Sequence, residues 1–177
     1  LELVDARHDA LKDVSAKAVS VVGDADVEDG LADASKHGEI AVSHDLCPGV
    51  RVVSGSRDAV AAFQVPGAVL TETDARQGAH SPLAADAAAA YDALLVQALA
   101  GAAELAHPLH VAAPAGGVAT DAAAAGDALR GSLGRPVAWR AAMERLLAAG
   151  ATHFVDAGGG AQLRAFGERC GAGEWLW

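Results

Sequence analysis

Cysteine and aromatic residues are scarce in this chain of 177 residues. The two cysteines, Cys47 and Cys170, are too few for a disulfide framework and lack the spacing of a metal site. We expect both thiols to be reduced. Phe, Trp and Tyr together make up 4% of the residues, and much of the 52% hydrophobic content is alanine. This composition predicts a folded protein with closely packed helices rather than a disordered chain.

Positive charge and long hydrophobic runs are also lacking. The chain has 13 Lys and Arg against 23 Asp and Glu, which is a formal net charge of −10. Nucleic acid is therefore not expected as a partner, because phosphate binding needs clustered basic side chains. No uncharged apolar run reaches the roughly 18 residues of a membrane span, and no secretory signal is visible near the start. We expect no membrane association and a cytoplasmic location.

Residues 16–74 have the pattern of a small module of strands and helices. The β-rich runs alternate with two helical segments, one ending near Gly38 and one capped by Ser56. The expected strands are 16–23, 39–44, 50–55 and 67–74, with a turn at 45–49, and the expected helices begin at 24 or 26 and at 56. This β-α-β-β-α-β order predicts a ferredoxin-like subdomain.

The rest of the chain has longer helices that alternate with short strands. The expected helices are 2–14, 82–103, 120–131, 136–149 and 161–169, and the expected strands are 108–113 and 152–158. Strands separated by helices favour an α/β layer with parallel strands. We therefore expect an α/β fold in which 1–15 is a helix of a large subdomain, 16–74 is the inserted module and 75–177 completes the large subdomain.

His80 lies directly before the Ser-Pro pair that begins the long alanine-rich helix. A helix start needs only a capping side chain, so the imidazole is either incidental or a functional group. Two other patterns are weaker. His107 directly precedes and His110 lies within the expected strand 108–113, but no third metal ligand is nearby. The glycine triplet at 158–160 is more typical of a tight turn than of a phosphate site. The residue pattern alone leaves the role of His80 open.

Four stretches, in order and at suitable spacing, resemble segments of one enzyme family. "GAHSPL", which contains His80, resembles the histidine segment of the malonyl-CoA:acyl carrier protein transacylases and of the acyltransferase domains of polyketide synthases. The other three are "LVDARHDAL" (3–11), "CPGVRVVSG" (47–55) and "GRPVAWRAAMERLLAAGATHFVDAGGGAQLRAF" (134–166). The resemblance spans nearly the whole chain but only the later part of the family's length.

The resemblance implies the trailing part of an α/β-hydrolase-like acyltransferase body with an inserted ferredoxin-like subdomain. It implies ping-pong transfer of a malonyl-type acyl group from coenzyme A to the phosphopantetheine thiol of an acyl carrier protein, through an acyl-serine. His80 would be the general base, oriented by the backbone carbonyl of Ser132, and Arg7 would bind the malonyl carboxylate. The coenzyme A thioester is then a substrate, and no permanently bound cofactor or metal is expected.

The chain departs from this family in one important respect. No Gly-x-Ser-x-Gly segment occurs in it, so the nucleophilic serine would have to come from a preceding segment or from a partner chain. Leu46, Val50, Ala79 and Arg135 also replace residues usual in the family. Two alternatives therefore stay open. One is a non-catalytic acyltransferase-like interaction or scaffold module, and the other is the malonyl-transferring subunit of a malonate decarboxylase.

Overall fold

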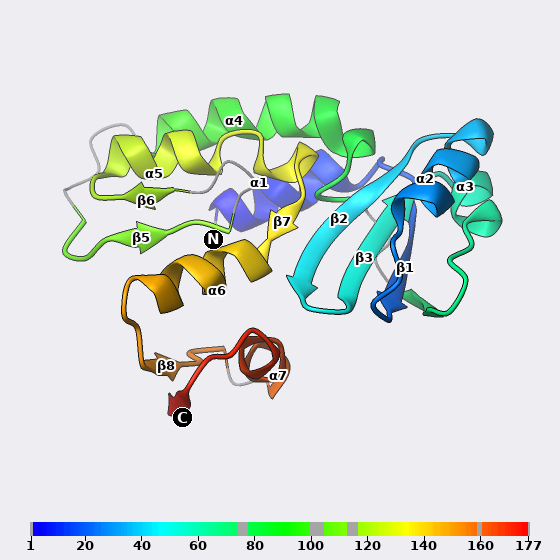
Figure 1. Cartoon of the computed structure of the whole chain (residues 1–177). Helices are drawn as coiled ribbons and strands as arrows, with labels where there is room; N and C mark the ends of the chain where they lie inside the picture. Colours follow the sequence, from blue (N-terminus) through cyan, green and yellow to red (C-terminus); the bar gives the residue numbers. More distant parts are fainter. Residues whose placement is uncertain (1, 74–77, 100–104, 113–116, 159–160, 177) are drawn as a thin grey trace.

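The computed structural model describes residues 2–73, 78–99, 105–112, 117–158 and 161–176. It is a mixed α/β structure in which a strand-rich module lies beside a group of helices, with a smaller C-terminal unit below them (Figure 1). Among the described residues, no helix is both long and apolar enough to cross a lipid bilayer.

The strand-rich module is built on an antiparallel sheet. Its elements are β1 (Lys17–Val22), α2 (Glu28–Ala34), β2 (Ile40–Cys47), β3 (Val50–Gly55), α3 (Arg57–Ala62) and β4 (Val69–Thr73). The strands pair in the order β4-β1-β3-β2, and every one of these neighbouring pairs is antiparallel. The order of strands and helices along the chain is the one that the sequence predicts. Position 74, the expected end of the last strand, lies outside the described residues.

The hairpin between β2 and β3 is tighter than expected. We predicted a turn over 45–49, but β2 continues to Cys47, which is buried and pairs with Val50. Only Pro48 and Gly49 form the turn, and Gly49 has φ +71°, a conformation that glycine adopts at little cost. Register shifts in β2 beside His44 accommodate the extra residues.

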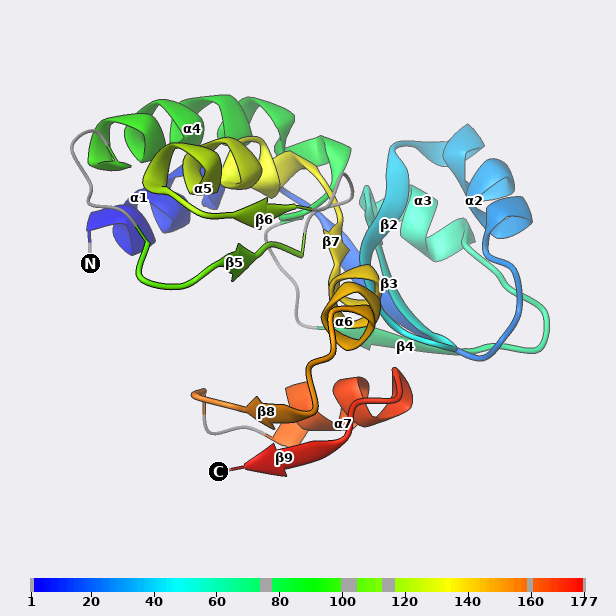
Figure 2. The same cartoon turned by 60° about the vertical axis from the view of Figure 1, so that its left-hand side comes forward.

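The helices of the module cover one face of this sheet and bury its core. The Ser56 side chain accepts a hydrogen bond from the Ala59 N–H and begins α3, as predicted. The buried core cluster consists of Val19, Val21, Val27, Ala34, Val53, Phe63 and Val65. Figure 2 shows α2 and α3 on one side of the sheet and α6 (Trp139–Ala148) on the other.

The second group of elements is helical and closely packed. The helices α1 (Glu2–Leu11) and α4 (Ala85–Leu99) lie side by side, with α5 (Ala122–Leu129) next to α4 (Figures 1 and 2). Alanines of α4 pack against Leu11 and Leu133 in a second buried cluster. Small side chains allow this close approach, as the alanine content predicts. The expected extension of α4 to 103 lies outside the described residues.

The expected layer of parallel strands is found only in part among the described residues. β5 (Leu109–His110) pairs antiparallel with β6 (Val118–Ala119), and β8 (His153–Val155) pairs parallel with β9 (Glu174–Leu176) in a separate sheet beside α7 (Ala161–Arg169). β7 (Val137–Ala138) joins the main sheet, parallel to β2. Strands of two or three residues are too short to show the alternation that identifies a strand, so β6, β7 and β9 were not predicted.

Candidate functional site

His80 stands in a constrained turn between the strand-rich module and α4. Its φ is +66°, which makes it the only described residue other than glycine with positive φ. Its N–H donates a hydrogen bond to the Leu133 carbonyl, and the buried Ser81 hydroxyl closes the turn on the Gly78 carbonyl. A 3₁₀ turn, η2 (Pro82–Ala84), then leads into α4. Strained backbone of this kind persists only where the surrounding contacts hold it.

The imidazole of His80 is oriented by the backbone carbonyl that the sequence analysis named. Nδ1 lies 2.8 Å from the carbonyl oxygen of Ser132, so Nδ1 carries the proton and donates it. Nε2 of the neutral ring is then left with a lone pair. Burial lowers the pKa of His80 below 6.5, the backbone hydrogen bond to Ser132 opposes this, and the charge of Arg7 lowers the pKa further. The ring is therefore neutral at pH 7 and able to accept a proton.

A second histidine, which the sequence analysis did not identify, contacts this ring. His44 of β2 meets His80 edge to face, with ring centroids 5.2 Å apart and planes at 74°. Nδ1 of His44 lies 3.0 Å from the hydroxyl of Ser43, and that hydroxyl donates to the Val52 carbonyl while accepting from Ser54. His44 Nδ1 is therefore the donor in its bond to Ser43. Burial, and after it the charge of His80, lowers the pKa of His44 to about 4.

A cavity of about 230 Å³ opens beside His80. His80, Ser132 and Arg135 are its polar lining, and the remaining walls are apolar side chains from β7 and α5 and from the segment after β5. Arg135 was identified only as a departure from the family pattern, although its position directly before the Pro-Val pair could have placed it here. Two of the predicted site residues, His80 and Ser132, therefore meet at one cavity.

Arg7, the third predicted site residue, does not line this cavity. It lies on α1, its side chain is exposed, and it has no hydrogen bond or ion pair with another described residue. Its charge nevertheless contributes to lowering the pKa of His80, so the two side chains are within electrostatic range.

The weaker sequence patterns concern His107, His110 and the glycine triplet at 158–160. No group of three or more His, Cys, Asp or Glu side chains is arranged to hold a metal ion among these residues. The Gly158 N–H donates to the Asp156 carboxylate, as in a closed turn, and 159–160 lie outside the description. Burial raises the pKa of the Cys47 thiol, and raises that of Cys170 to about 11, so neither is an activated nucleophile.

Comparison with known proteins identifies the fold. No family model and no curated protein sequence matches this chain. Among solved structures, a malonyl-CoA:acyl carrier protein transacylase from Clostridium perfringens superposes with a TM-score of 0.86 and 16% identity, over 99% of this chain and 58% of that one. The corresponding transacylase from Coxiella burnetii gives 0.85 and 18%, with 99% and 58% covered.

A third solved structure has a partner. It is a malonyl-transacylase in complex with its type II polyketide synthase acyl carrier protein, and it matches with a TM-score of 0.85 and 17% identity over 98% of this chain and 59% of that one. The chain thus spans less than two thirds of the length of these proteins. At these identities the likeness concerns the fold, and it confirms at that level the resemblance found in the sequence. This chain has the fold of the part of the malonyl-CoA:acyl carrier protein transacylases that it matches.

Proposed function

We propose that this chain is the trailing portion of an acyltransferase that moves a malonyl-type acyl group from coenzyme A to the phosphopantetheine thiol of an acyl carrier protein. The observation that carries this proposal is the arrangement of His80. Its Nδ1 is held by the Ser132 carbonyl 2.8 Å away, its Nε2 has a free lone pair, and its ring borders a cavity. The transacylase fold supports the same reaction class.

The chemistry needs a base with the properties of His80. A serine hydroxyl is a weak nucleophile at pH 7, so a neutral imidazole takes its proton as the oxygen attacks the thioester carbonyl. The carbon–sulfur bond then breaks, and the imidazolium returns the proton to the departing coenzyme A thiolate. The carrier thiol reverses the sequence and releases the serine. The serine itself would come from a segment or partner chain outside these residues.

Arg7 is the proposed receptor for the free carboxylate of the malonyl group. A guanidinium binds a carboxylate through two parallel hydrogen bonds, which would favour malonyl over acetyl. Arg7 is exposed and has no partner among the described residues that would compete. Arg135, which lines the cavity at His80, is the alternative receptor that an experiment has to exclude.

The proposal extends to the organisation of the chain. The antiparallel strand order β4-β1-β3-β2, with two helices on one face, supports a ferredoxin-like subdomain. Its insertion into an α/β-hydrolase-like body is part of the proposal. The boundaries at 15 and 74 stay predictions, as does a cytoplasmic location. The acyl carrier protein and malonyl-CoA are the expected partners.

The test is acyl-serine formation. The protein is purified with whatever polypeptide supplies the serine, incubated with labelled malonyl-CoA and analysed by mass spectrometry. We expect labelling on serine that His80→Ala abolishes and that His107→Ala, a change of an exposed histidine, leaves intact. Unchanged labelling in His80→Ala refutes the role of His80.

The same experiment distinguishes the alternatives. If no serine is labelled while the carrier protein still binds, the result favours a scaffold module. The absence of a Gly-x-Ser-x-Gly segment from this chain agrees with that alternative. Decarboxylation of the transferred group by co-purifying subunits would favour a malonate decarboxylase.

A further inference from the structure

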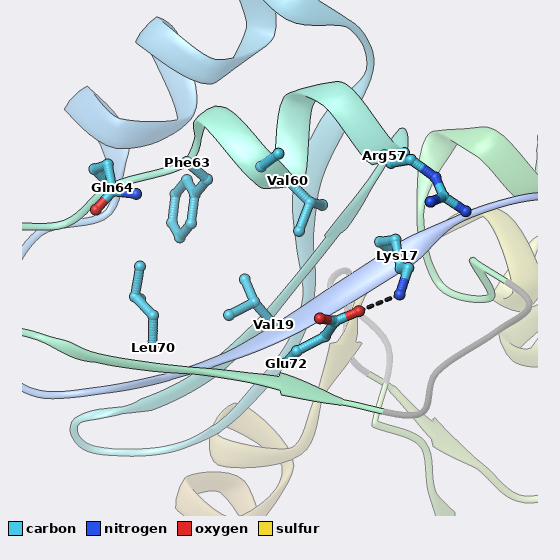
Figure 3. A pocket seen from close by; sticks show the side chains of 9 residues that line it. Lys17, Val19, Arg57, Val60, Phe63, Gln64, Leu70 and Glu72 are labelled. Carbon is cyan, nitrogen blue, oxygen red and sulfur yellow. Dashed lines mark hydrogen bonds and ion pairs between the residues drawn. The ribbon is translucent and has the colours of Figure 1, made fainter.

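A second cavity lies within the strand-rich module. Its volume is about 380 Å³, against about 230 Å³ for the cavity at His80, and the two have no lining residue in common. It opens between α3 and the segment that follows it on one side and the strands β1 and β4 on the other (Figure 3). We call this cavity the α3–β4 slot. It is a site distinct from the one described above.

The middle of the slot is apolar and reaches the core of the module. Val19 and Phe63 line it, and both belong to the buried core cluster, with 7% and 1% of their surfaces exposed. Val60 and Leu70 are partly buried and pack against that cluster from the two sides of the slot. A hydrocarbon chain placed here would lose part of its contact with water, and this loss is the main favourable contribution to binding an apolar group.

One end of the slot is charged, and the sequence spacing explains why. Lys17 and Val19 are two residues apart on β1, and Leu70 and Glu72 are two apart on β4, so each pair shares the face that α3 covers. Arg57 and Val60 are three apart on α3 and also share a face. Both walls therefore pass from charged to apolar in the same direction. Figure 3 shows Arg57, Lys17 and Glu72 together at one end, and Phe63 and Leu70 toward the other.

The charged end has one cation in excess. Lys17 donates a hydrogen bond to the Glu72 carboxylate, and this bond, followed by the charges of Lys17 and Arg57, lowers the pKa of Glu72 and keeps it ionised. Arg57 is exposed and has no hydrogen bond to another described residue. Lys17, Arg57 and Glu72 together carry a net charge of +1. This charge matches a monoanion better than a phosphate dianion. A guanidinium can bind a carboxylate in a bidentate manner.

We propose that the α3–β4 slot binds an amphiphilic monocarboxylate. The carboxylate lies on Arg57, and the apolar chain extends between Val60 and Leu70 toward Phe63. The volume of 380 Å³ falls within the roughly 300–1,000 Å³ typical of small-molecule sites. The slot does not depend on the acyl transfer proposed above, because none of its residues borders the cavity at His80.

Octanoate is the probe, and the methyl groups of the slot report on its binding. In a ¹³C methyl NMR titration of the whole chain we expect saturable shifts at Val19, Val60 and Leu70. Arg57→Gln weakens octanoate binding about tenfold or more, because a hydrogen bond to a charged group is lost. Arg130→Gln makes the same chemical change at an exposed arginine paired with Asp127, and it leaves the affinity unchanged. Octanol and octylamine bind much more weakly than octanoate.

A second variant tests the apolar part of the slot. Ala61→Phe adds a ring from an exposed position that lines the slot, so it fills the cavity without disturbing the core. We expect it to abolish octanoate binding while the circular dichroism spectrum stays that of the wild type. Equal binding of octanol and octanoate, an unchanged affinity in Arg57→Gln, or shifts that spread without saturation over other methyl groups would each overturn the proposal.

Discussion

The contact between His44 and His80 predicts how stability depends on pH. His44 is largely enclosed beside a second imidazole, and its pKa is lowered from 6.5 to about 4. In the unfolded chain His44 takes up a proton as the pH falls through about 6.5, whereas the folded state resists protonation until about pH 4. The unfolded state therefore binds more protons in this window, and the free energy of unfolding must fall as the pH falls from about 6.5 to 4.

The magnitude follows from the same values. Each pH unit between the two pKa values corresponds to about 1.4 kcal/mol, so the contribution of His44 alone has an upper bound of roughly 3.5 kcal/mol. His44 remains partly accessible to water, which screens the interaction, and we discount the effect to about 2 kcal/mol. The neighbouring His80, whose pKa is lowered mainly by burial, acts in the same direction.

Urea denaturation followed by circular dichroism at pH 7 and pH 4.5 measures this effect. We expect the wild type to lose more stability than His44→Asn on acidification, with a difference of about 2 kcal/mol between the two losses. His107→Asn replaces an exposed histidine and serves as the matched control. If His44→Asn loses as much stability as the wild type between these pH values, the burial of a neutral His44 against His80 is wrong.

Three further predictions concern single residues. Arg7→Gln should lower the preference in kcat/KM for malonyl-CoA over acetyl-CoA about tenfold or more, and Arg7→Lys should have a preference between those of Arg7→Gln and the wild type. If Arg135→Gln loses the preference instead, Arg135 is the carboxylate receptor. Leu133→Ala should lower the free energy of unfolding by about 2–5 kcal/mol in urea denaturation, because the Leu133 side chain is only 2% exposed. The control Leu94→Ala should change this free energy much less, because Leu94 is 44% exposed. Gly49→Ala should lower the free energy of unfolding by about 1–2 kcal/mol. The φ of +71° at position 49 is strained for alanine, and the new methyl group would lie 2.9 Å from Asp24 Oδ1. An unchanged unfolding midpoint would contradict this prediction.

The elements that the sequence predicted well are those with strong local signals. The cap at Ser56 and the four β-rich runs identify the module, and α7 has the bounds expected for 161–169. These features depend on residues a few positions apart, so propensity and capping suffice. The runs 108–113 and 152–158 do not lie in one layer as expected, because strand partners are chosen by packing over long sequence separations. A run of two or three residues cannot specify its partner.

The residues of the candidate site were likewise predicted only where the sequence carried a local signal. His80 was visible as an unexplained imidazole at a helix start, and the resemblance pointed to the Ser132 carbonyl, which the structure places 2.8 Å from Nδ1. His44 was not foreseen, because a register shift in β2 changes the alternation beside it and no local pattern relates it to a turn 36 positions away.

The sequence by itself determined the local order of strands and helices, the charge of −10 and the absence of a nucleophile motif, because these depend on residue identity and near neighbours. Only the tertiary structure decided that His44 meets His80, that Arg7 lies outside the cavity, and that Lys17, Arg57 and Glu72 converge at one end of a slot. Contacts of this kind depend on strand register and on how helices pack across the sheet, and both are fixed by burial over the whole chain.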